Sequence, residues 1–245
     1  MPFRTLDPDK ILGTARRLAD RVQGRFPQRG LAHVAAEIVT TTEATIAETR
    51  ALAPPIWWLR LTVAAVVLAG AALFVSVGSI IPLTQIGRES IGSVQSFEAA
   101  INTILLCGLG LTALVRLEAR VKRQRVARGL HGLRSIIHVI DMHQLTKDPV
   151  TLTSAYARTP ASPKHDLDAT AMARYLDYCS ELLAITGKLA ALYAQAVSDE
   201  GVAQAVNDIE TLGSNLSRKV WQKIMMIETT APAPKAARRA APPPG

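Results

Sequence analysis

The sequence predicts an all-α protein, in which a two-span transmembrane helical hairpin carries a membrane-proximal cytoplasmic helical bundle. Three observations lead to this prediction. Two long segments contain no ionisable side chain, basic residues are concentrated on one side of them, and apolar residues elsewhere recur at helical spacing. With 49 % hydrophobic residues and a mean hydropathy of +0.18, the 245-residue chain is more apolar than most soluble proteins.

Residues 1–55 are expected to form N-terminal cytoplasmic helices. Asp7 or Asp9 can cap a helix over residues 10–24, whose apolar side chains recur every three or four positions. A second helix is predicted over residues 31–52. It is expected to be the weaker of the two, because the threonines at 40–42 are β-branched and lose side-chain freedom in a helix.

Residues 56–117 are predicted to form the transmembrane hairpin, with spans at about 61–83 and 99–116. Residues 61–83 and 99–115 carry no ionisable side chain, and a bilayer core about 30 Å thick is crossed by roughly 17 to 25 helical residues. Because residues 1–50 are polar, the first span is expected to be an uncleaved anchor and not a signal peptide. The membrane interface is assigned to Trp57, Trp58, Arg60 and Arg116, which suit the headgroup region.

The distribution of basic residues predicts the orientation of the hairpin. Lys and Arg are frequent in residues 1–50 and 116–128, whereas the connection at 84–98, expected to be a short exposed turn, carries only Arg88. Positive residues resist translocation, so both termini are placed in the cytoplasm, at a bacterial inner or plasma membrane. The net charge of +8 is then interpreted as attraction to anionic lipid headgroups. No nucleic-acid partner is predicted, because no recognition module accompanies the charge.

Residues 118–228 are predicted to form the cytoplasmic bundle. One helix is expected to continue from the second span to about residue 148, although Gly129 and Gly132 are positions where it can bend. After an irregular connection at 150–165, two further helices are predicted over 166–197 and 199–228, the last with the near-heptad spacing of a coiled coil. Residues 229–245, rich in Ala and Pro and basic, are expected to be a disordered tail.

The most distinctive polar pattern lies in the first bundle helix. His131, Arg134, His138 and Asp141 are spaced three, four and three residues apart and so share one helix face. We call this set the polar ridge and interpret it as a polar seam between bundle helices. Two alternatives stay open: a metal site that uses His131, His138 and Asp141, and a pH sensor. The ridge offers too few ligands for a complete site and lacks zincin spacing, so no metal and no cofactor are predicted.

Other residues that can carry chemistry are given structural roles. Cys107 and Cys179 are predicted to be buried free thiols, because two isolated cysteines do not make a disulfide framework. Tyr175, Tyr178 and Tyr193 are predicted to pack between helices. No catalytic residue is assigned, since no nucleophile or nucleotide-binding motif occurs in a suitable context.

The sequence therefore favours a membrane-anchored scaffold or interaction protein, whose bundle binds a protein partner or a second copy of the chain. The alternative is an oligomeric channel or transporter-like subunit. For that reading, polar residues of the spans would line a path: Asn102, Thr103, Ser76 and Thr112. A metal-dependent enzyme or sensor built on the polar ridge is the third hypothesis.

Overall fold

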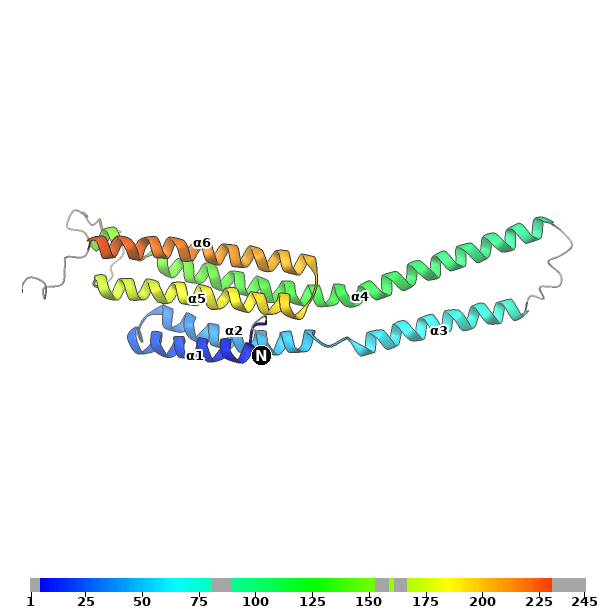
Figure 1. Ribbon diagram of the computed structural model, residues 1–245, viewed down its shortest axis with the longest axis horizontal. Helices are drawn as coiled ribbons and strands as arrows, with labels where there is room; N and C mark the ends of the chain where they lie inside the picture. Colours follow the sequence, from blue (N-terminus) through cyan, green and yellow to red (C-terminus); the bar gives the residue numbers. More distant parts are fainter. Residues whose placement is uncertain (1–4, 81–89, 153–158, 161–166, 231–245) are drawn as a thin grey trace, which may run out of the picture. The chain divides into compact units, whose positions relative to one another are not determined.

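The computed structural model describes residues 5–80, 90–152, 159–160 and 167–230, without side chains at 59–60, 67, 71, 73–75, 77–80, 90–100, 102–103, 106–107, 111, 113–115 and 230. Over the described residues the chain is helical and contains no strand (Figure 1), which confirms the predicted all-α class. The elements are α1 (Pro8–Arg25), α2 (Gly30–Leu52), α3 (Trp57–Ile80), α4 (Ser90–Leu145), the 3-10 helix η2 (Pro149–Leu152), α5 (Ala169–Ala196) and α6 (Glu200–Thr230).

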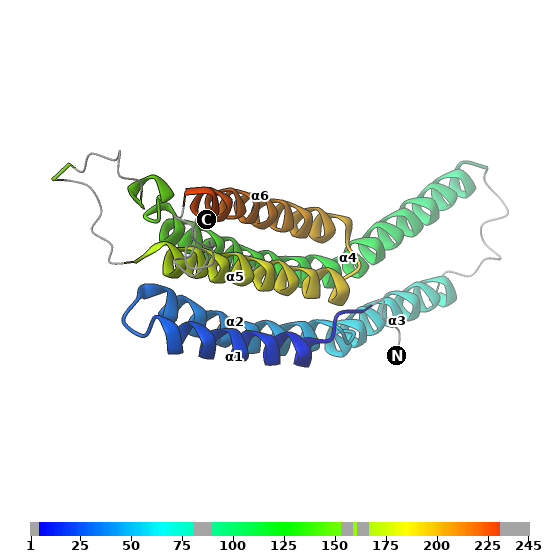
Figure 2. The ribbon, with the colours of Figure 1, turned by 60° about the vertical axis from the view of Figure 1, so that its left-hand side comes forward.

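Two compact units divide the chain. The first, which we call the bundle unit, combines Met1–Ala51 with Val126–Gly245. The second, the α3–α4 unit, is Leu52–Arg125. Helices α1 and α2 thus belong to the same unit as α5, α6 and the C-terminal part of α4. The predicted helical bundle is confirmed by this unit, whose helices lie side by side in both ribbon views (Figures 1 and 2).

Helix α1 begins at one of the two caps that the sequence offered. The Asp7 carboxylate accepts hydrogen bonds from the backbone N–H groups of Asp9 (3.0 Å) and Lys10 (3.3 Å). Pro8 occupies the first helical position, where a missing N–H costs nothing. The buried face of α1 is the apolar face predicted from periodicity: Ile11, Ala15, Leu18 and Val22.

Helix α2 is continuous through its threonines, where the sequence predicted a weaker helix. Thr42 and Thr49 are buried, and their hydroxyls donate to the carbonyls of Ile38 (2.6 Å) and Thr45 (2.8 Å). A buried hydroxyl without a partner would cost about 1 to 3 kcal/mol. Bonding to the preceding turn removes that cost, so α2 can bury threonines against its neighbours.

Helix α4 starts earlier than the predicted second span. Residues 90–98 are helical, although they belonged to the expected turn at 84–98, and residues 84–89 lie outside the described part. No proline interrupts this stretch, and helix formation is cooperative, so the helix extends backwards from the apolar segment. The same helix passes Gly129 and Gly132 without a break. Its bundle half buries residues spaced four and three apart: Val126, Leu130, Leu133, Ile137 and Ile140.

Aspartates open the last two helices. Asp168 accepts a hydrogen bond from the backbone N–H of Ala171 (2.7 Å), and Asp199 accepts one from that of Val202 (3.1 Å). Asp199 is the residue from which the sequence predicted the last helix. Helix α6 extends to Thr230, two residues further than expected, and the rest of the predicted tail lies outside the described residues.

In the α3–α4 unit, two charged side chains tie the segment before α3 to α4. Glu118 accepts a hydrogen bond from the backbone N–H of Ile56 (3.2 Å), and Lys122 donates one to the carbonyl of Pro54 (3.0 Å). The Lys122 ammonium also lies 3.2 Å from the Glu118 carboxylate, and the two side chains are only 15 % and 17 % exposed. We call this arrangement the Glu118–Lys122 clasp.

Among the residues that the structure describes, no helix combines the length and the apolar content needed to cross a membrane.

Candidate functional site

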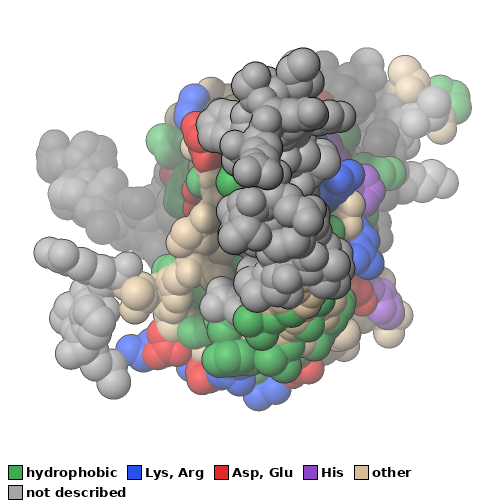
Figure 3. All heavy atoms as spheres, turned by 90° about the vertical axis from the view of Figure 1, so that its right-hand side faces the viewer, with side chains coloured by type: hydrophobic (Ala, Val, Ile, Leu, Met, Phe, Trp, Pro, Cys, Tyr) green, Lys and Arg blue, Asp and Glu red, His purple; other side chains and the backbone are tan. Residues whose placement is uncertain are grey.

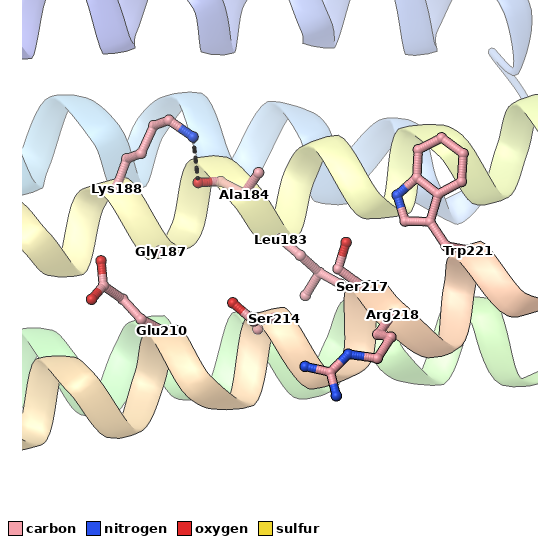
Figure 4. A pocket seen from close by; sticks show the side chains of 10 residues that line it. Leu183, Ala184, Gly187, Lys188, Glu210, Ser214, Ser217, Arg218 and Trp221 are labelled. Atoms are coloured by element: carbon pink, nitrogen blue, oxygen red, sulfur yellow. Dashed lines mark hydrogen bonds between the residues drawn. The ribbon is translucent and has the colours of Figure 1, made fainter.

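A groove lies between α5 and α6 on the bundle unit. It has a volume of about 740 Å³ and is lined by both helices. Figure 4 shows its labelled side chains, with Lys188 and Glu210 at one end and Trp221 at the other. The residues along it are mostly small or polar: Ala184, Gly187, Gly213, Ser214 and Ser217, with Leu183, Lys188, Glu210, Arg218 and Trp221.

Contacts along the groove define how α5 and α6 are aligned. The hydroxyls of Ser180 and Ser217 lie 3.0 Å apart. A Cβ on Gly187 would meet Cγ of Glu210 at 4.0 Å, and a Cβ on Gly213 would meet the carbonyl oxygen of Leu183 at 3.8 Å. The two helices are therefore antiparallel. A residue on α5 lies level with a residue on α6 when their two residue numbers add up to about 397, as for Ser180 and Ser217.

Three charged side chains at the groove are unpaired within the described part of the chain. Lys188 donates a hydrogen bond to the carbonyl of Ala184 (3.3 Å), but it forms no ion pair there, and neither Glu210 nor Arg218 does so. All three are exposed. Exposed charges keep their hydration at little cost, so they are available to a partner that brings opposite charges.

Trp221 joins this groove to a second hollow of about 420 Å³ near the N-terminal end of α5. Half of its surface is exposed (51 %). On α5 this hollow is lined by Ala169, Thr170 and Ala173, and also by the charged residues Arg174 and Asp177. An exposed tryptophan next to a hollow is typical of a protein-binding surface, where aromatic side chains contribute most of the binding energy.

The polar ridge lies on α4 within the bundle unit. His131, Arg134 and His138 are exposed, and Asp141 is half-buried. Asp141 accepts a hydrogen bond from the side-chain amide of Gln144 (2.6 Å). Within the described residues, no group of three or more His, Cys, Asp or Glu side chains is arranged to hold a metal ion. His33 on α2 is exposed as well.

A buried basic cluster lies at the end of α4, beyond the ridge. His143 is half-buried, with Nδ1 3.4 Å from the Tyr175 hydroxyl. Lys147 is only 9 % exposed, and its ammonium lies 5.2 Å from the centre of the Tyr175 ring. Burial, and then the charge of Lys147, lower the pKa of His143. Burial, and then Arg29, lower the pKa of Lys147.

Lys223 brings a further amine to this cluster from α6. Its ammonium donates to the backbone carbonyl and the side-chain oxygen of Gln144, both at 2.8 Å. Burial lowers the pKa of Lys223, while the nearby Asp148 and Asp141 oppose that shift. Burial raises the pKa of the Cys179 thiol to about 12, so the thiol is protonated and unreactive near neutral pH. The cluster therefore connects α4, α5 and α6.

The predicted roles of the tyrosines and of Cys179 are confirmed. Tyr175, Tyr178, Tyr193 and Cys179 are all buried. Sequence reasoning did not find Lys147 and Lys223, because a lysine is normally solvated and nothing in the sequence marks these two as buried. The groove was not found either, since it depends on which residues of α5 and α6 lie level with one another.

The predicted interface residues lie in the α3–α4 unit. Trp57 and Trp58 are exposed, as is Arg116, whereas the Arg60 side chain lies outside the described residues. Of the residues considered for a channel, Asn102 and Thr103 also lack described side chains, as does Cys107. Ser76 and Thr112 are exposed, and their hydroxyls donate to carbonyls of their own helices, at Ala72 and Leu109.

Comparisons with known proteins identify no relative of this chain: no family model, no curated protein and no solved structure matches it.

Proposed function

We propose that this protein is a membrane-anchored scaffold, in which a two-span hairpin formed by α3 and the first part of α4 anchors the bundle unit to a membrane. The bundle then presents its α5–α6 groove to protein partners. The observation that carries the anchor is the exposure of large apolar side chains along both helices. Leu68 is 69 % exposed and Leu109 is 71 % exposed, with other members of the set beside them: Trp57, Trp58, Leu61, Val66, Ile104 and Leu105.

Such exposure is unfavourable in water, where each Å² of apolar surface costs about 25 cal/mol relative to an apolar environment. Lipid removes this cost. In the full sequence, residues 61–83 and 99–115 contain no ionisable side chain, which makes hydrocarbon an acceptable environment for both segments. Figure 3 shows green, hydrophobic side chains gathered on the lower part of the face towards the viewer.

The basic residues after the second segment support an inner-face position for the bundle. Arg116, Arg120, Arg123, Arg125 and Arg128 are exposed on α4. Each basic residue near an anionic membrane surface contributes about 1 kcal/mol of attraction. Anionic lipid headgroups are therefore the lipid partner that we propose, with both termini on the cytoplasmic side.

Alkaline extraction of membranes tests the anchor. The wild-type protein should stay in the membrane fraction, as integral proteins do. Leu68→Arg and Leu109→Arg should each release a large fraction, because an arginine at the centre of a span costs about 2.5 to 3.5 kcal/mol of insertion free energy. Leu117→Arg is the matched control, since Leu117 is a partly exposed apolar residue next to Arg116, and it should be retained. Complete release of the wild-type protein would contradict the anchor.

A further inference from the structure

The α5–α6 groove has features of a helix-packing surface. The groove is lined in part by small residues, Ala184, Gly187 and Gly213. Because these residues have little or no side chain, another helix can approach the backbones of α5 and α6 closely. The hydroxyls of Ser214 and Ser217 also line the groove, and they can form hydrogen bonds to water or to another polar surface. A deep, apolar small-molecule site would look different, because it would enclose its ligand with hydrophobic and aromatic side chains.

The charges along the groove complement those of a second copy of the same chain. Because α5 and α6 are antiparallel with the alignment given above, Lys188 on α5 lies level with Glu210 on α6. A two-fold axis parallel to the helices would place α5 of one copy over α6 of the other, at the same level. Lys188 would then face Glu210 of the second copy, and Glu210 would face the second copy's Lys188.

We propose that the α5–α6 groove is the surface through which two copies of this chain associate, about a two-fold axis parallel to α5 and α6. The second copy is then the protein partner of the groove. This inference rests on the proposed function only in taking the groove as a docking surface. Such an interface is isologous, so each contact occurs twice. Two Lys188–Glu210 pairs would form in each dimer, and neither group has an ion-pair partner within its own described chain.

Trp221 fits the same arrangement. By the alignment of the helices it lies level with residues near 176 on α5, close to the hollow that Ala173, Thr170 and Ala169 line. The two-fold axis places each Trp221 over this part of the other copy. Its exposed face would then leave water and pack against the α5 residues that line this hollow in the other copy, among them Ala173, Arg174 and Asp177. The dimer would thereby gain two aromatic anchors, both at the Trp221 end of the groove.

Charge reversal in the full-length protein tests the pairing. The mass of the detergent-solubilised chain is measured by light scattering after size exclusion, over a dilution series. Wild type should be a dimer, and Lys188→Glu and Glu210→Lys should each weaken the dimer about tenfold, because each change puts two like-charge pairs into it. The double variant Lys188→Glu/Glu210→Lys should restore the wild-type dissociation constant to within about threefold. Lys219→Glu, exposed on α6 but outside the groove, should have no effect.

Several results would overturn the dimer. They are a wild-type monomer at every concentration, single reversals that leave the dimer unchanged, and a double variant as weak as the single ones. Rescue of Glu210→Lys by Arg218→Glu instead would indicate an antiparallel pairing of α6 about Ser214 and would overturn the proposed axis. Alkaline extraction of the same cells separates this failure from that of the anchor. A membrane-retained monomer contradicts only the dimer, and a released dimer contradicts only the anchor.

Discussion

The glycines of α4 decide how closely its neighbours approach. A Cβ at Gly129 would overlap the hydroxyl of Tyr193, which reaches past α4 to donate a hydrogen bond to Glu48 on α2. Burial, and then Glu48, raise the pKa of Tyr193, so its hydroxyl remains a donor. Gly132, three residues further along the same helix, has no other atom within 4 Å of such a Cβ. The missing Cβ of Gly129 thus leaves space for Tyr193, whereas a Cβ at Gly132 would meet no neighbour.

Alanine at these two glycines should therefore change stability in opposite directions. Gly129→Ala should lower the free energy of unfolding by about 1 to 3 kcal/mol, because Tyr193 must move and lose its bond to Glu48. Gly132→Ala should raise it by about 0.5 to 1 kcal/mol, since alanine favours the helix and meets no neighbour there. Thermal unfolding of the full chain in detergent measures both. Equal effects of the two variants would show that Gly129 does not provide space for Tyr193.

His143 should make the bundle sensitive to acid. Its pKa in the folded chain lies below the ordinary value of about 6.5, because of burial and Lys147. The unfolded chain therefore binds a proton more readily than the folded chain. Stability is fully present above pH 6.5 or so, and it falls as the pH drops below that value.

Replacing His143 by Gln removes this titration. Between about pH 7 and pH 5, the melting temperature of His143→Gln should fall less than that of wild type. His33→Gln, which removes an exposed imidazole from another helix of the bundle unit, is the matched control. The comparison uses the slope with pH, so a constant loss of stability in the variant does not affect it. An unchanged slope in His143→Gln would refute the role of His143.

At the scale of elements, the Glu118–Lys122 clasp connects the segment that follows α2 to α4. Pro54 cannot donate a backbone hydrogen bond and tends to leave the preceding segment extended. The clasp fixes the conformation of this segment, because Glu118 accepts a hydrogen bond from the backbone N–H of Ile56 and Lys122 donates one to the carbonyl of Pro54. Both side chains are largely buried, so the pair is less screened by salt than a surface ion pair.

Breaking the clasp should loosen this segment locally. In Glu118→Ala, the backbone N–H of Ile56 loses its acceptor, and its hydrogen exchange should become about tenfold faster or more. Glu118→Gln keeps a side-chain oxygen and should exchange more slowly than Glu118→Ala. Arg120→Ala, an exposed basic residue on the same helix, should leave the exchange unchanged. Exchange that is equally fast in all four proteins would show that the clasp does not order the segment.

Periodicity predicted the helices of the bundle because each buries one face. The positions of Ile11, Leu18 and Val22 on α1 follow directly from their spacing, and the start of α1 follows from Asp7 and Pro8. Spacing within one helix does not predict how two helices align. The groove depends on the contact between Ser180 and Ser217, and the basic cluster depends on the contact between Lys147 and the Tyr175 ring. Neither contact follows from spacing within one helix.

The ends of helices were less predictable where the local sequence contains no residue that stops a helix. Nothing in residues 90–98 ends a helix, so α4 extends through a stretch whose serines and glycine favoured a turn. The polar ridge shows a related limit. Its regular spacing placed His131, His138 and Asp141 on one helix face, but the same spacing is compatible with a solvated surface, and two of these three residues are exposed.

At the scale of the whole molecule, the chain divides its apolar residues between two environments. In the bundle unit they are buried between helices, as for Leu133, Ile137 and Leu176. In the α3–α4 unit large apolar side chains such as Leu61, Leu68 and Leu109 are exposed. Water suits the surface of the first unit, and the proposed bilayer suits that of the second. The membrane anchor that we propose would account for both kinds of surface in one chain.

The topology of the anchor can be measured with a membrane-impermeant thiol reagent on intact cells. In a chain whose native cysteines, Cys107 and Cys179, are replaced by alanine, a cysteine at Ser93 should be labelled from outside, because it lies between the two proposed spans. A cysteine at Ser135, exposed on the bundle half of α4 and outside the groove, should be labelled only after the membrane is permeabilised. Labelling of Ser135→Cys in intact cells, or protection of Ser93→Cys there, would contradict the proposed two-span anchor with a cytoplasmic bundle.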